Sequence, residues 1–170
     1  MRAEVQAALR EAGLPPGALV PVRVTRYRAV LDRVRDTFTT GSRWTGHQRP
    51  LWTARKGHLV SAQVADGPST VALLIPGPDA VWLLLEDWAG TKAEGRHWVF
   101  EGEARAAAAV LGQLFHVEYA VVARDCSWLL CENHHGVMTA VGDVMKERFQ
   151  ALLAQSVAGL AAPPQGGRVS

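Results

Sequence analysis

The densest group of side chains capable of chemistry is Glu132-Asn133-His134-His135, which directly follows the apolar run 128–131. A glutamate and a histidine can exchange protons near neutral pH, so this group is the candidate for acid–base hydrolysis. Adjacent histidines on extended backbone point to opposite sides, and both face one ligand only if the chain turns. Asn133 and Gly136 are typical of such a turn. The alternative is architectural: Glu132 and Asn133 pair with backbone groups where the strand ends.

A zinc site would have to combine Cys126 and Cys131 with His134 and His135. This spacing lacks the paired C-x-x-C pattern of structural zinc sites, so we predict no metal and no other cofactor. A disulfide between the two cysteines would close a very short loop and stabilise little. We therefore expect both to be reduced thiols. Phosphate-binding loops, nucleophile elbows, H-E-x-x-H and calcium loops are also missing from the sequence, which disfavours the familiar enzyme classes.

Acidic residues end two consecutive strand-like runs: Glu86 and Asp87 the first, and Glu101 the second. In a hairpin they would meet at one rim of the sheet, where paired carboxylates bind a metal or share a proton. Alternatively they end strands, and Glu101 caps the helix that starts at Glu103.

Positive charge is concentrated in the first part of the chain. Residues 1–60 hold 11 Lys/Arg against 4 Asp/Glu, whereas residues 61–170 hold 7 against 12. This asymmetry is compatible with an acidic partner or a nucleic acid, and equally with solvated charges. Aromatic residues beside arginines are typical of protein interfaces and single-strand sites. The candidate binding residues are Arg26, Arg28, Arg33 and Arg35 on the polar face of one helix, and Trp44 and Trp52 in the segment that follows.

Apolar periodicity predicts the elements that position these residues. Spacings of three and four predict helices over 3–13, 25–38 and 103–114 and a last helix from Asp143, whereas residues 47–70 show no dominant period. Short apolar runs predict strands at 80–85, 97–101, 118–123, 127–132 and 136–141, paired as hairpins. The order predicts an α+β fold: a mainly antiparallel sheet with helices packed on one face. We expect one domain over 1–161 and a flexible tail over 162–170.

Bulk composition is that of an ordinary globular domain: 170 residues, 48% hydrophobic and 20% charged. No apolar run is long enough to span a membrane, and the charged N-terminus lacks a signal-peptide core. The cytoplasm is therefore the expected compartment.

The second half of the chain resembles an uncharacterised family of small bacterial proteins. The family shares an aromatic strand ending in Glu-Asp, a W-x-F/Y-E-G strand and a W-L-x-C-E-N-H-H-D segment. This chain has Gly136 where the pattern has an acidic residue. The matching positions are Glu86, Asp87, Trp98, Glu101, Gly102, Tyr119, Trp128, Cys131, Glu132, Asn133, His134 and His135. The resemblance implies no activity.

The element order is also similar to that of the Smi/Knr-like superfamily, which includes immunity proteins of bacterial toxin systems; this is an analogy of fold alone. Together with the missing enzyme signatures and the charge asymmetry, this fold analogy favours a non-enzymatic protein-binding function, immunity-like or regulatory. The alternatives are a hydrolase or nuclease using Glu132, Asn133, His134 and His135, and nucleic-acid binding through the basic half.

Overall fold

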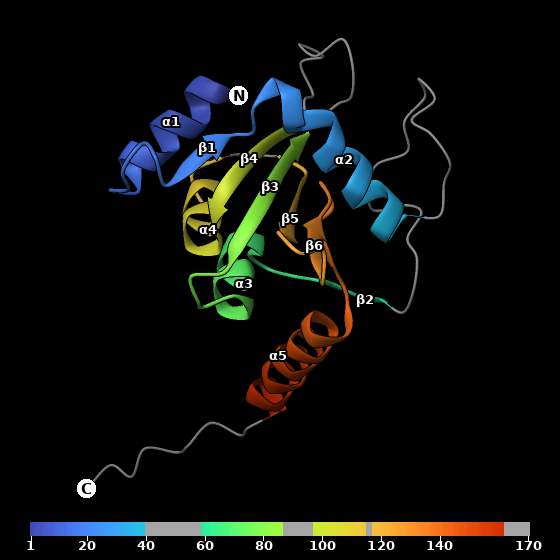
Figure 1. Ribbon diagram of the computed structural model, residues 1–170. Coiled ribbons are helices and arrows are strands. Elements are labelled where there is room, and N and C mark those ends of the chain that lie inside the picture. Colours follow the sequence, from blue (N-terminus) through green and yellow to red (C-terminus); the bar gives the residue numbers. More distant parts are fainter. Residues whose placement is uncertain (40–58, 87–96, 115–116, 162–170) are drawn as a thin grey trace, which may run out of the picture.

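The fold is a seven-stranded antiparallel sheet with helices on both faces, seen in a computed structural model that describes residues 1–39, 59–86, 97–114 and 117–161 (Figure 1). The strand order is β1-β4-β3-β5-β6-β7-β2, and each neighbouring pair is antiparallel. The predicted α+β class with an antiparallel sheet is therefore confirmed. The strands are β1 (Leu19–Pro21), β2 (Leu59–Gln63), β3 (Ala80–Glu86), β4 (His97–Glu103), β5 (Tyr119–Ala123), β6 (Leu129–Glu132) and β7 (Val137–Val141).

Four of the five described helices share one face of the sheet. The helices are α1 (Arg2–Glu11), α2 (Val24–Phe38), α3 (Gly67–Leu74), α4 (Ala104–Leu111) and α5 (Asp143–Ala161). Buried residues of α1, α3, α4 and α5 form one core with the sheet, whereas those of α2 form a second core on the opposite face. The expectation that helices pack on one face thus holds for every described helix except α2. None of these helices is both long and apolar enough to cross a membrane.

The sequence of β3 explains why α2 lies on the other face. Successive residues of a strand point to opposite faces, and β3 is apolar on both: Leu83 and Leu85 face the larger core, Trp82 and Leu84 the smaller. A sheet that is apolar on both faces must be covered on both. The apolar stripe of α2 supplies the second cover with Val30, Leu31, Val34 and Phe38.

The predicted hairpins are confirmed, and their register fixes the positions of the candidate residues. In the β3–β4 hairpin Glu86 lies opposite His97 and Trp82 lies opposite Glu101. β5, β6 and β7 form a continuous meander. Trp128, directly before β6, is 7% exposed and belongs to the larger core.

Three described elements were not predicted: β1, β2 and α3. The sequence predicted no helix or strand over residues 14–21, where β1 lies, and residues 47–70, which show no dominant period, contain β2 and the start of α3. The α3 residue Asp66 is a clear N-cap, because its carboxylate accepts the Ser69 N–H at 3.2 Å and Pro68 occupies the first turn. That signal was present in the sequence.

Candidate functional site

The segment after β6 is a tight turn organised by Asn133. The Asn133 side-chain oxygen accepts the backbone N–H groups of His135 at 3.0 Å and Val137 at 3.1 Å. The Asn133 carbonyl accepts the N–H of Gly136 at 3.0 Å, and Gly136 has φ +70°, a conformation that favours glycine. The predicted architectural role of Asn133 is therefore confirmed.

The two histidines of this turn lie side by side. Their ring centroids are 3.8 Å apart with planes inclined at 50°. Adjacent histidines would point apart on extended backbone, but the chain turns at this point, as Asn133 and Gly136 indicated, and the two rings meet. His134 exposes 51% of its side chain, while its backbone N–H and its ring Nδ1 both contact one carboxylate oxygen of Glu118.

Glu118 belongs to a buried carboxyl pair that sequence analysis missed. Glu118 and Glu86 are 2% and 6% exposed, and the Glu86 N–H donates to the Glu118 carbonyl at 3.0 Å. Burial raises the pKa of Glu118, but hydrogen bonds from the Glu86 side chain and from His134 outweigh it and place the pKa below its ordinary value.

On the other face of the sheet, Glu132 links β6 to the start of α3. A Cβ added to Gly67 would lie 1.7 Å from a Glu132 carboxylate oxygen and 2.6 Å from the Tyr119 hydroxyl. Tyr119 lies opposite Glu132 in the register and is 3% exposed. The pKa of Glu132 is raised by burial and by Asp66, although the Tyr119 hydroxyl lowers it in part. Glu132 is thus packed against a helix N-terminus, which favours a negative charge.

A pocket of about 260 Å³ opens beside this packing. Tyr119, Glu132, Asn133 and His134 supply its polar wall. Its apolar wall consists of Pro68, Leu111, Leu114 and Val117.

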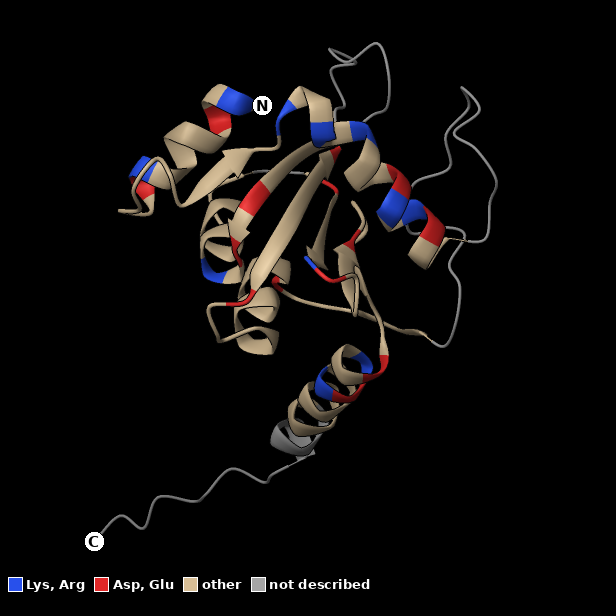
Figure 2. Cartoon of the chain, in the orientation of Figure 1, with Lys and Arg blue, Asp and Glu red and all other residues tan. Residues whose placement is uncertain are grey.

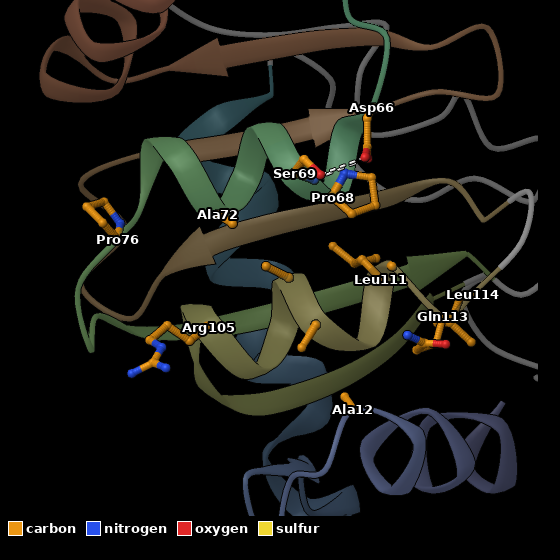
Figure 3. Close-up of a pocket in the computed structure, with 13 residues that line it drawn as sticks. Ala12, Asp66, Pro68, Ser69, Ala72, Pro76, Arg105, Leu111, Gln113 and Leu114 are labelled. Atoms are coloured by element: carbon orange, nitrogen blue, oxygen red, sulfur yellow. Dashed lines mark hydrogen bonds between the residues drawn. The ribbon is translucent and has the colours of Figure 1, made fainter.

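A larger groove of about 780 Å³ runs between α3 and α4 (Figure 3). Its floor holds small side chains, among them Ala72 and Ala109, and its ends carry opposite charges. Arg105 lies at one end with Pro76, and Asp66 lies at the other near Leu111 and Leu114 (Figure 3). Pro68, Leu111 and Leu114 line the groove and the pocket alike, so the two adjoin at these side chains.

The arginines of α2 do not form one stripe. Arg26 and Arg33 lie on one flank of the buried stripe of α2, and Arg28 and Arg35 lie on the other. Acidic residues are interspersed among them (Figure 2). A single basic face on this helix was therefore a wrong expectation, because residues two apart on a helix point in different directions.

The arginines of α2 contact acceptors within the protein. Arg26 lies 3.6 Å from the Glu101 carboxylate. Arg33 donates to the Asp125 carbonyl at 3.1 Å. Arg35 contacts Asp32 and Asp36, each at 3.0 Å.

Glu86 and Glu101 do not meet at a rim. Their partners in the register, His97 and Trp82, place them four residues apart along the hairpin, roughly 13 Å. Glu101 also does not cap α4, because the N-cap of that helix is Glu103. The Glu101 carboxylate instead contacts Arg124 at 3.0 Å.

The remaining predicted positions are scattered or outside the described part. Cys126 precedes β6 whereas His134 follows it, so the four residues of the zinc alternative are not brought together. Both cysteines are buried free thiols. Trp44, Trp52, Asp87 and the tail 162–170 lie outside the described residues.

Glu118, Asp66 and Gly67 were not predicted as site residues, and Tyr119 was noted only as a position that matches the family pattern. The Asp-Gly-Pro-Ser start of α3 was the available signal for Asp66 and Gly67. Glu118, directly before β5, carries no local signal, because its role depends on which strands lie beside β5.

The family comparison agrees with the resemblance to an uncharacterised family. No curated protein and no solved structure matches the chain. One family model matches residues 1–153, and its description is a family of unknown function, DUF6756. Because the match spans most of the 170 residues, the chain belongs to the DUF6756 family.

Proposed function

We propose that this protein is a non-enzymatic binding domain, immunity-like or regulatory, that holds a segment of a partner protein in the groove between α3 and α4. The observation that carries the proposal is the groove itself. Its volume of about 780 Å³ lies within the range of roughly 300–1,000 Å³ that is usual for ligand sites. Small side chains on the floor let another backbone approach closely, and charged ends orient it.

The state of the candidate catalytic residues also supports binding over catalysis. Asn133 uses its side-chain oxygen for two backbone N–H groups, and Glu132 is packed against Gly67 and Tyr119. Side chains that are held by such hydrogen bonds and packing are poorly placed to exchange protons with a substrate. The Smi/Knr-like analogy and a cytoplasmic location are compatible with this function and remain part of the proposal.

Nucleic-acid binding is the weaker alternative. Counterion release requires cations that are available to phosphates, whereas Arg26, Arg33 and Arg35 contact acceptors of the protein itself. We expect no binding of single-stranded DNA at low salt, measured by fluorescence anisotropy. Tight binding that weakens steeply with added salt would favour the nucleic-acid alternative.

The binding proposal can be tested by filling the groove. Displayed random twelve-residue peptides are selected against the full chain, and the affinity of an enriched peptide is measured by anisotropy. Ala72 is exposed and lines the groove, so Ala72→Tyr should weaken binding at least tenfold, a loss of about 1.4 kcal/mol. The matched control is Ala154→Tyr on the exposed side of α5, which should bind as the wild type does. Failure to enrich any peptide, or equal weakening by both variants, would contradict the proposal.

One observation favours a second function, acid–base catalysis at His134. The His134 ring contacts buried Glu118 and lines the pocket beside Tyr119. A buried carboxylate that orients a histidine is the arrangement of a general base. A screen of ester, phosphodiester and amide substrates would support this function if His134→Asn abolished an activity that His135→Asn retained. Activity unaffected by His134→Asn would exclude it.

A further inference from the structure

We propose that the pocket beside Tyr119 receives an arginine side chain of the bound partner segment, with the guanidinium group at Glu132 and Asp66. This inference rests on the proposed function of the groove and names the chemistry of its occupant. The occupant is an extended segment of a partner protein that carries one arginine and, further along, one acidic residue.

The shared lining of the two cavities provides the path. Pro68, Leu111 and Leu114 form a common wall, so a chain lying in the groove can send a side chain over Pro68 into the pocket. These apolar residues match the methylene stem of a long cationic side chain, which is buried readily while its charged end reaches polar groups.

The charges at this end of the groove select a cation. Asp66 lines the groove, and Glu132 lines the adjoining pocket. Burial and the charge of Asp66 raise the pKa of Glu132, so a cation placed between the two carboxylates relieves their repulsion. Guanidinium suits a half-buried carboxylate better than ammonium does, because it is more weakly hydrated and presents a planar fork of N–H donors.

The positive charge of Arg105 at the opposite end of the groove determines in which direction the partner segment lies. Arg105 lies at the start of α4, six residues before Leu111. Six helical residues span roughly 9 Å, which an extended chain covers in about three residues. The segment therefore carries its acidic residue about three to four positions from its arginine.

Model compounds test the pocket on the full-length protein. N-acetyl-arginine methylamide is titrated into ¹⁵N-labelled protein, and amide shifts are followed by NMR. We expect saturable shifts at Gly67 and Asn133, smaller shifts with the lysine analogue and none with the uncharged citrulline analogue. Glu132→Gln should weaken the arginine affinity at least fivefold, and Glu147→Gln, an exposed glutamate of α5, should not change it.

Asp66→Ser is the second variant, since serine retains the N-cap of α3 but removes the charge. It should fold as the wild type does and also weaken the arginine compound. Equal shifts with the arginine and citrulline compounds, or shifts confined to other surfaces, would overturn the arginine pocket. If selected peptides require an open groove at Ala72 but tolerate citrulline for arginine, only the pocket proposal fails; if no peptide is enriched, the groove function fails as well.

Discussion

Replacing Gly67 by alanine tests the packing that joins the candidate site to the fold. The new Cβ would lie 1.7 Å from the Glu132 carboxylate oxygen and 2.6 Å from the Tyr119 hydroxyl, far inside contact distance. Glu132 must therefore move away, and the buried Tyr119 hydroxyl loses its polar neighbour.

The expected loss of stability combines two costs and one smaller gain. Overpacking costs about 1–3 kcal/mol, and leaving a buried polar group without its neighbour costs about 1–3 kcal/mol. The stiffer unfolded chain of an alanine variant recovers about 0.4–1 kcal/mol. Gly67→Ala should therefore lower the free energy of unfolding by about 1–5 kcal/mol.

Urea unfolding followed by tryptophan fluorescence measures this change, because Trp82 and Trp128 are buried. Gly17→Ala is the matched control: a Cβ there meets nothing within 4 Å, so stability should change by less than about 0.5 kcal/mol. In a Glu132→Ala background the clash with the carboxylate is absent and only the contact with the Tyr119 hydroxyl at 2.6 Å remains, so Gly67→Ala should cost clearly less than in the wild type. A loss under about 1 kcal/mol in the wild-type background, or the same loss in both backgrounds, would refute the packing described for Glu132.

Three further predictions concern the core, the turn and the buried carboxyl pair. Trp128→Ala should cost about 3–5 kcal/mol in urea unfolding, and a cost under about 1 kcal/mol would show that this side chain is not in the core. Asn133→Ala removes the acceptor of two turn N–H groups and should cost about 1–2 kcal/mol, with a lower Tm; an unchanged Tm would contradict the role of Asn133. The folded pKa of Glu118 lies below its ordinary value of 4.5, so its stabilisation is present above that pH and lost as pH falls through the folded pKa. Between about pH 5 and pH 3 the wild type should therefore lose more unfolding free energy than Glu118→Gln, and parallel pH profiles would disprove the pairing.

Much of the fold could be predicted because its central elements carry strong local patterns. The β3–β4 and β5–β6–β7 segments are short apolar runs separated by polar turns, and α2 has a regular apolar stripe. β2 alternates between exposed and half-buried residues at a sheet edge, so it lacks the apolar run of a central strand. β1 has only three residues and ends in a proline.

The candidate site was less predictable because it depends on register. Asn133 could be assigned to a turn, since its side chain acts on residues two and four positions later. Glu118 reaches His134 across sixteen residues, and only the β5–β6 pairing places them together. The placement of Glu86 beside Glu118 requires the β3–β5 pairing, which joins strands that are not consecutive.

The groove could not be predicted from the sequence, because it too depends on which elements the fold brings together. Its walls come from the end of α1, from α3 and from α4, and small residues such as Ala72 and Ala109 carry no signal of function. The helix pair α3–α4 creates the groove only after the sheet has brought both helices to one face.

The position of a bound peptide on the protein tests the proposed function most directly. A peptide enriched against the full chain is added to ¹⁵N-labelled protein, and the perturbed amides are mapped by NMR. The groove proposal predicts that the largest shifts lie at Ser69, Ala72, Ala109 and Gly112, which line the groove. Shifts centred instead on α2 or on the edge strand β2, with these four amides unchanged, would contradict it.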